Sequence, residues 1–158
     1  MHIACSKYSD LDDLVINKAS ELNLPLIGGT ALEIWASYFG RDDVRKRSDN
    51  DLDFITNRAS DVKKLQEWVV SNIDSTKVTV DVYYVKSHDI SKYICNINST
   101  LVMDIVYILW SKLIRASKKD LIDCKWILSI DEISDEELVT KLEDLGLTES
   151  EVNLLNSL

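Results

Sequence analysis

The residues best suited to chemistry lie in the stretch LIGGTALEIWASYFGRDDVRKRSDNDLDFIT, positions 26 to 56. Asp51 and Asp53 alternate within DLDFIT, a segment whose pattern predicts a β-strand. Side chains at i and i+2 of a strand point to one face, so the Cα atoms of the pair would lie roughly 6 to 7 Å apart. Mg²⁺ is commonly bound by one or two carboxylates together with substrate phosphates. A solvated strand end carries the same pair without a metal, so the pair alone leaves both interpretations open.

Gly28 and Gly29 predict the end of one strand and the start of a helix. Backbone N–H groups at a helix N-terminus attract anions, and glycine lets a phosphate approach closely. Thr30 adds a hydroxyl at the same place. By itself a glycine pair is mostly turn chemistry, but Asp51 follows Gly29 by 22 residues. The combination favours a site for Mg²⁺ and a phosphate.

These residues resemble the signature of the DNA polymerase β-like nucleotidyltransferase superfamily, in which a strand, a Gly-Gly or Gly-Ser turn and a helix precede an Asp-x-Asp strand. GGTAL, with Arg47 four residues before Asp51, is similar to the AbiEii-type nucleotidyltransferases of bacterial toxin–antitoxin systems. A second segment, ILWSKLIRASKKDLIDCKWIL at 108–128, resembles their lysine on one helix and Lys-Asp-Leu-x-Asp run on the next.

The resemblance implies that Asp51 and Asp53 are catalytic metal ligands and that Gly28 and Gly29 contact phosphate. It implies a third catalytic and metal-binding carboxylate on the next long strand, where VTVDVYY places Asp81. Asp104 is the rival, although its position is more typical of a helix cap. An exposed acid on an edge strand is the alternative for Asp81.

The resemblance also implies that Lys112 contacts a triphosphate, whereas a lysine that extends from an apolar face to solvent is the alternative. Asp120 would pair with Lys112 or orient the acceptor, and Asp123 is more typical of a structural residue. Asp49 is a departure, because relatives usually carry Ser, Thr or His two residues before the first aspartate. The nucleotide-binding and phosphate-binding set is Gly28, Gly29, Thr30, Arg47, Ser48, Lys112 and Asp120.

The implied reaction moves a nucleoside monophosphate from a nucleoside triphosphate to an acceptor hydroxyl, using two Mg²⁺ ions, with Mn²⁺ as the alternative ion. The resemblance suggests a tRNA or other RNA 3′ end, or a partner protein in a toxin–antitoxin system, as the acceptor. A small molecule such as an antibiotic is the second enzymatic hypothesis. A catalytically inactive nucleotide-binding or antitoxin-like module is the hypothesis from a different functional class.

The net charge of −9 at first argues against a polyanionic partner. However, residues 127–158 hold nine acids and one base, a balance of −8, which leaves −1 for the other 126 residues. Residues 107–126 hold five bases and two acids, a balance of +3. The body of the chain therefore has room for a local cationic pocket.

The alternation of patterns predicts an α/β (α+β) fold, a mixed sheet flanked by helices with a helical C-terminal part. We expect a nucleotidyltransferase core over 1–104 and the helical part over 105–158, packed as one compact domain. Three dispersed cysteines and no long apolar run indicate no zinc site and no membrane partner, and we expect a soluble, cytoplasmic protein. Expected helices are 9–22, 30–40, 60–73, 105–115, 119–130 and two after Ser134 joined at Gly146; expected strands are 24–28, 51–56, 77–85, 92–97 and 100–103.

Overall fold

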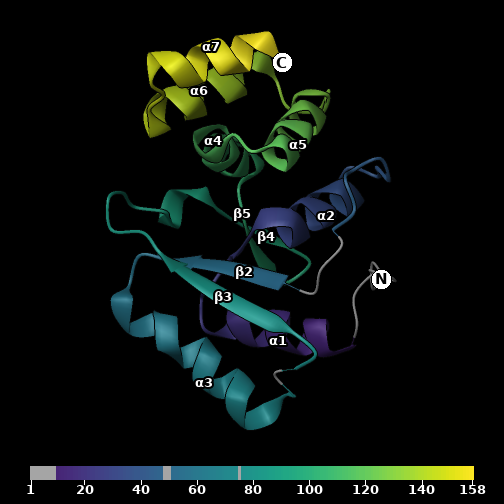
Figure 1. Cartoon of the computed structure of the whole chain (residues 1–158), viewed down its shortest axis with the longest axis vertical. Coiled ribbons are helices and arrows are strands. Elements are labelled where there is room, and N and C mark those ends of the chain that lie inside the picture. Colours follow the sequence, from purple (N-terminus) through teal and green to yellow (C-terminus); the bar gives the residue numbers. More distant parts are fainter. Residues whose placement is uncertain (1–9, 48–50, 75) are drawn as a thin grey trace.

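A five-stranded mixed sheet lies in the middle of the molecule, with helices on both faces (Figure 1). The computed structural model describes residues 10–47, 51–74 and 76–158. In chain order the elements are α1 (Asp10–Glu21), β1 (Leu26–Ile27), α2 (Gly28–Tyr38), β2 (Asp51–Thr56), η1 (Ala59–Asp61), α3 (Val62–Asn72), β3 (Thr79–Tyr84), η2 (Ser91–Tyr93), β4 (Ile94–Ile97), β5 (Thr100–Met103), α4 (Ile105–Arg115), α5 (Lys118–Leu128), α6 (Asp135–Leu145) and α7 (Glu149–Ser157). The predicted fold class is confirmed.

The strands run in the order β3-β2-β1-β5-β4, so the shortest strand, β1, is central. It pairs antiparallel with β2 and parallel with β5. β2 and β3 are parallel, and their register places Asp53 opposite Asp81. This register brings two candidate carboxylates from separate strands to neighbouring positions on the same face.

The two faces of β2 differ in chemistry because side chains alternate along a strand. Leu52 and Phe54, on one face of β2, are fully buried, whereas Asp51 and Asp53, on the other face, are half-buried, with Asp53 Oδ2 close to Gly28 at the start of α2. α1 and α3 lie along the first face of the sheet (Figure 1). The second face lies on the side of α2 and the four C-terminal helices, which group together at one end of the molecule (Figure 1). The sheet therefore presents its acidic positions toward the C-terminal helices.

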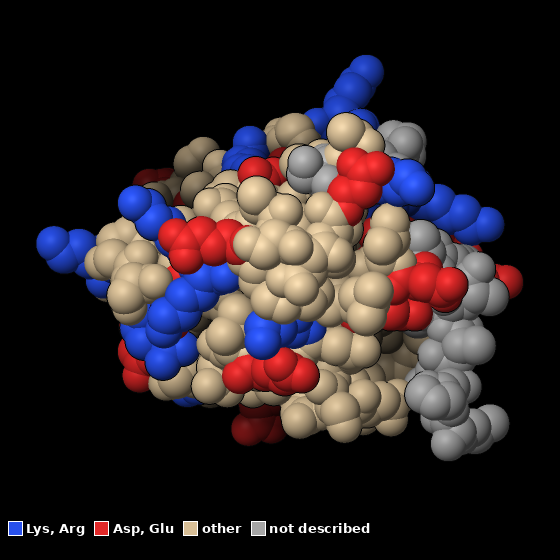
Figure 2. All heavy atoms as spheres, turned by 90° about the horizontal axis from the view of Figure 1, so that it is seen from below, with Lys and Arg blue, Asp and Glu red and all other residues tan. Residues whose placement is uncertain are grey.

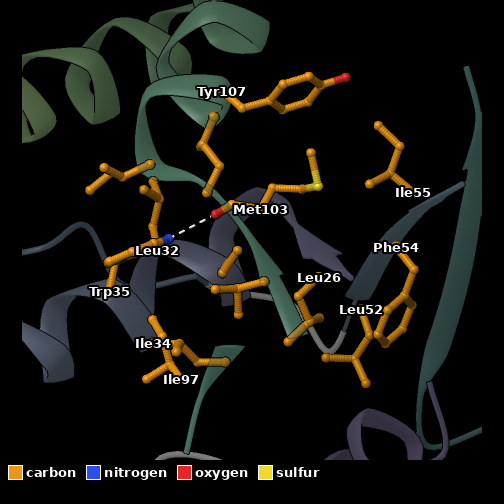
Figure 3. Packing of buried hydrophobic residues seen from close by; sticks show 14 of the residues in the cluster. Leu26, Leu32, Ile34, Trp35, Leu52, Phe54, Ile55, Ile97, Met103 and Tyr107 are labelled. Atoms are coloured by element: carbon orange, nitrogen blue, oxygen red, sulfur yellow. Dashed lines mark hydrogen bonds between the residues drawn. The ribbon is translucent and has the colours of Figure 1, made fainter. Parts of the chain in front are cut away.

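The hydrophobic core joins the sheet to α2 and α4. The Trp35 indole N–H donates a buried hydrogen bond of 2.9 Å to the Met103 carbonyl, which fixes α2 to the end of β5 (Figure 3). Leu26 and Leu52 pack in the same cluster (Figure 3). The cluster continues into the C-terminal helices through Leu113 and Ile127. One core thus spans both parts of the chain.

The C-terminal helices begin at polar caps. Asp104 accepts a 2.8 Å hydrogen bond from the Val106 N–H at the start of α4, which confirms its predicted role as a cap. α5 begins at Lys118, one residue earlier than expected, because Ser117 and Asp120 form a reciprocal capping box. Such caps satisfy backbone N–H groups that have no partner within their own helix.

α6 and α7 are joined at Gly146 as predicted, and each begins at a hydroxyl cap. Ser134 caps α6 by accepting from the Glu137 N–H, whereas the Glu137 carboxylate pairs with Lys141 rather than closing a capping box. Thr148 and Glu151 form a full capping box at α7.

Two N-terminal elements also differ from the sequence prediction. The strand expected over 24–28 is reduced to Leu26–Ile27, and α2 begins directly at Gly28. A 3₁₀ turn at Ala59–Asp61 precedes α3, so the helix expected from Ser60 begins at Val62. Ser9, the first residue of the helix expected over 9–22, lies outside the described residues.

The surface seen from the side of α1 and α3 mixes acidic and basic side chains among uncharged residues (Figure 2). Within the described ranges, no helix has both the length and the apolar character needed to cross a bilayer.

The Trp35–Met103 hydrogen bond yields a stability prediction. Trp35→Phe keeps an aromatic ring but leaves the Met103 carbonyl without its indole donor, so we expect the free energy of unfolding to fall by about 1–3 kcal/mol. Chemical denaturation measures this change. Trp68→Phe, in a half-buried residue of α3, is the matched control and is expected to cost less. Equal losses in the two variants would contradict the assigned role of the hydrogen bond.

Candidate functional site

A pocket of about 360 Å³ opens where the start of α2 and the start of β2 meet α4 and α5. Its wall carries five bases and three acids, a balance of +2 in a chain whose net charge is −9. The wall contains eight of the residues that the sequence singles out. The lining residues are Gly28, Gly29, Thr30, Arg45, Arg47, Asp51, Asp53, Lys112, Arg115, Ser117, Lys119 and Asp120.

Gly28 is required at the pocket by both its backbone and its surroundings. Its φ of +78° lies in the left-handed region, where side chains with a Cβ are strained. A Cβ at this position would also lie 2.8 Å from Oδ2 of Asp53. The absent side chain therefore lets the Asp53 carboxylate sit directly against the beginning of α2. At Gly29, by contrast, the nearest atom to a Cβ would be 3.8 Å away, which is ordinary contact.

The three candidate carboxylates come together through strand register. Asp51 and Asp53 both line the pocket, and Asp81 is the partner of Asp53 on β3. Asp81 is not part of the pocket wall and lies one strand farther toward the sheet edge. These placements put Asp81 beside the pocket rather than in it.

Tyr83 lies close enough to these carboxylates to sense their charge. Burial makes the largest contribution in raising the pKa of Tyr83 above its ordinary value. The negative charges of Asp53, Asp81 and, more weakly, Asp51 raise it further, and Arg115 opposes the shift. The three carboxylates and Arg115 therefore all lie near enough to Tyr83 to affect its pKa.

Asp104, the rival for the third carboxylate, is engaged elsewhere. It caps α4, and its Oδ2 lies 2.6 Å from Lys141 Nζ on α6. Asp104 follows β5, and β1 separates β5 from β2, so Asp104 is not paired with Asp53 as Asp81 is. The geometry favours Asp81 as the neighbour of the acidic pair.

The acidic pair offers oxygen ligands of the kind that suit a divalent cation. In 10–47, 51–74 and 76–158, no group of three or more His, Cys, Asp or Glu side chains has the arrangement of a ready metal cluster. Asp51 and Asp53 nevertheless supply oxygen ligands on a pocket wall whose opposite side is basic. Mg²⁺ characteristically takes one or two carboxylates and completes its coordination with phosphate oxygens and water.

Lys112 is almost fully buried on α4 and is held by carboxylates from α5. Its Nζ lies 2.8 Å from Asp123 and 3.5 Å from Asp120. Asp123, itself 1% exposed, also accepts two hydrogen bonds from Arg45, of 3.0 and 2.9 Å. Asp123 thus fixes two basic residues of the pocket wall from beneath.

Asp120 is tied to the lip of the pocket. It accepts hydrogen bonds of 2.7 Å from Arg115 and from the Ser117 hydroxyl. Burial by itself would raise the pKa of Asp120, but these hydrogen bonds and nearby positive charges outweigh it, and the pKa is lowered. Asp120 therefore stays ionised at neutral pH. The predicted pairing of Asp120 with Lys112 is present, while its orientation of an acceptor stays a prediction.

Arg47 supports the start of β2. Its guanidinium donates 2.6 Å to the Asp51 carbonyl and 2.9 Å to the Asp12 carboxylate, and its Nε lies 3.9 Å from Glu33. Asp12 and Glu33 are both buried, so Arg47 balances their charge while it positions Asp51. Its phosphate-binding role stays a prediction. Ser48, predicted to bind nucleotide, and Asp49 lie outside the described residues.

Four residues of the pocket wall, Arg45, Arg115, Ser117 and Lys119, were not among the predicted site residues. Arg115, Ser117 and Lys119 lie within the segment that resembles the family and partly within its basic run, so a signal was present. Arg45 comes from a polar loop whose pattern gave no such signal. Asp123 is structural as predicted, but the charges it holds belong to the pocket.

Comparison with known proteins adds no assignment: no protein-family model matches the chain, and no curated protein matches it significantly.

Substituting Gly28 tests the contact between α2 and Asp53. Gly28→Ala combines a left-handed backbone with a clash, so we expect the unfolding free energy to fall by at least about 2 kcal/mol. Gly40→Ala is the matched control, because Gly40 has a φ of +67° but nothing within 4 Å of a Cβ. It is expected to lose only about 1 kcal/mol. Denaturant titration of both variants checks the difference, and equal losses would contradict it.

Substituting Asp123 tests the buried charge network. Asp123→Asn keeps the shape but removes the counter-charge of Lys112 and Arg45, so we expect a loss of about 3 kcal/mol in unfolding free energy. Asp131→Asn makes the same charge change at an exposed position after α5 and is expected to stay within about 0.5 kcal/mol of the parent chain. An unfolding free energy that is unchanged by Asp123→Asn would contradict the role of this network in fixing the bases of the pocket.

Proposed function

We propose that the protein is a Mg²⁺-dependent nucleotidyltransferase that moves a nucleoside monophosphate from a nucleoside triphosphate to an acceptor hydroxyl. The observation that carries the proposal is the convergence, in one pocket, of a glycine-led helix start, a strand-borne acidic pair and a buried lysine. These features come from segments as distant as Gly28 and Lys112. Positioning and electrostatic stabilisation supply most of the catalysis in phosphoryl transfer, so a protein nucleophile is unnecessary.

The basic side of the pocket would hold the triphosphate. The first turn of α2 presents backbone N–H groups with a partial positive charge, and Gly29, where only Arg47 comes within 4 Å of a Cβ, leaves room for phosphate oxygens beside Asp53. Lys112, Arg115 and Lys119 approach from the other side of the pocket. Two opposed sets of donors would fix the phosphate chain without covalent contact.

The acidic side would hold the metal and receive the acceptor. When bound, Mg²⁺ on Asp51 and Asp53 would polarise the α-phosphate and neutralise the charge of the departing pyrophosphate. Asp81, opposite Asp53 in the neighbouring strand, would take the proton of the acceptor hydroxyl. The acceptor oxygen forms a bond to the α-phosphorus, the bond from that phosphorus to the β-phosphate oxygen breaks, and pyrophosphate leaves.

An RNA end is the acceptor that the surface favours. Arg115 lines the pocket with its side chain 61% exposed, and Lys118, Lys119 and Lys125 continue the exposed basic character along α5. Such a row would neutralise backbone phosphates beyond the reacting end. The stretch with the largest acidic excess, residues 127–158 with nine acids and one base, follows this row in the sequence. By resemblance, the activity would belong to a toxin–antitoxin pair.

Transfer of label from each α-labelled nucleoside triphosphate to total tRNA, with Mg²⁺, tests the proposal. We expect label in RNA and release of pyrophosphate, both abolished by chelation of the metal. Asp51→Asn removes a metal ligand and is expected to lower transfer by at least about 100-fold, because even outer partners of metal ligands are worth 10- to 100-fold. Asp131→Asn, the matched charge change outside the pocket, is expected to stay within about twofold.

The same experiment separates the alternatives when a lysate and an antibiotic panel replace the tRNA. Label on a protein or a small molecule would keep the chemistry and change the acceptor. Absence of both transfer and pyrophosphate from the parent chain, with every nucleotide and acceptor, would contradict the enzymatic proposal and leave a nucleotide-binding module.

A further inference from the structure

β3 is an edge strand that exposes two tyrosines of nearly equal accessibility. Tyr83 is 49% exposed and Tyr84 is 47% exposed. Because side chains alternate, Tyr83 shares its face with Asp81, while Tyr84 points to the face where α3 packs. The strand therefore offers one exposed ring beside the acidic residues and one equivalent ring on the other side of the sheet.

The order of the strands divides the surroundings of the pocket into two flanks. The glycine turn between β1 and α2 and the bases of α4 and α5 form the phosphate flank. β3 lies beyond β2 on the side away from β1, so Asp81 and Tyr83 belong to the opposite flank. In an in-line displacement the attacking oxygen enters on the side opposite the leaving group. An acceptor therefore approaches from the flank that carries Tyr83.

We propose that Tyr83 is a positioning residue for the acceptor, and that its ring is the platform on which a nucleobase next to the reacting hydroxyl stacks. This inference rests on the proposed function. The exposed ring lies two residues beyond Asp81 on the same strand face, a Cα separation of roughly 6 to 7 Å. A base stacked there would leave its sugar hydroxyl within reach of Asp81.

Tyr83 offers both parts of a stacking platform, a half-exposed ring face and a hydroxyl that can donate or accept a hydrogen bond. The ring belongs to the same flank as Asp81 and lies outside the wall that carries the bases.

Kinetics with total tRNA as the acceptor probe test the inference on the full chain. Stacking on an aromatic side chain is worth about 1–3 kcal/mol per base, which corresponds to roughly 5- to 150-fold in affinity. Tyr83→Ala is expected to raise the half-saturating tRNA concentration by that factor while the KM for the nucleotide changes less than about twofold. Tyr83→Phe and Tyr83→Trp keep a ring and are expected to restore acceptor binding.

Tyr84→Ala is the matched control, since it removes an equally exposed ring from the same strand and leaves the face of Asp81 untouched. It is expected to match the parent chain. If Tyr84→Ala weakens acceptor use as much as Tyr83→Ala, the edge strand acts through stability or through pairing with another chain, and the inference fails. It also fails if Tyr83→Ala raises the nucleotide KM as much as it raises the half-saturating tRNA concentration.

A binding measurement separates failure of this inference from failure of the proposed function. The anisotropy of a labelled single-stranded RNA oligonucleotide reports association without any transfer. Weaker binding by Tyr83→Ala alone supports the platform even if the parent chain transfers no label. Binding that is indifferent to Tyr83 overturns the inference even if transfer to RNA is observed.

Discussion

The buried carboxylate of Asp123 is the constraint on which the pocket depends. It pairs with Lys112 from α4 and with Arg45 from the loop before β2, so it joins the helical part of the chain to the segment that leads into the acidic strand. Burying charges is costly unless each is paired and hydrogen-bonded. The three groups therefore hold one arrangement, and that arrangement sets the distance between the basic and acidic walls.

Around this network, other contacts fix the same loop. Asp43 accepts a hydrogen bond from the Trp126 indole and pairs with Arg41, whose guanidinium also reaches Ser129 at the end of α5. The hydrogen bond from Arg41, followed by that from Trp126, holds the pKa of Asp43 well below its ordinary value. On the other side of the loop, Arg47 is clamped between α1 and the first residue of β2. Residues 41–47 are thus held both to α5 and to the first residue of β2.

The sequence predicts much of this fold, because its helices and strands carry clear periodicities. The least accurate element is the strand before the glycines, where five residues were expected and two pair. Hydrophobic patterning shows that 24–28 is buried, but pairing depends on β2 and β5, which come later in the chain. α5 begins one residue earlier than expected for a local reason: the Ser117 side chain caps the helix, so Lys118 is its first residue.

Some residues of the candidate site are likewise predictable from local patterns, whereas others depend on contacts between distant parts of the chain. Asp51, Asp53 and the glycines are predictable because strand alternation and a helix start are local rules. The partnership of Asp123 with Arg45 joins positions 78 residues apart, and no local pattern encodes it. Charge gives a partial substitute: the +3 segment at 107–126 indicates where bases outnumber acids, and residues 127–158 after it carry nine acids and one base. Because most of the net charge of −9 lies in this last stretch, the chain can keep a basic pocket wall. For the RNA acceptor of the proposed function, this net charge would act against binding at long range, so binding would depend on specific contacts at the pocket.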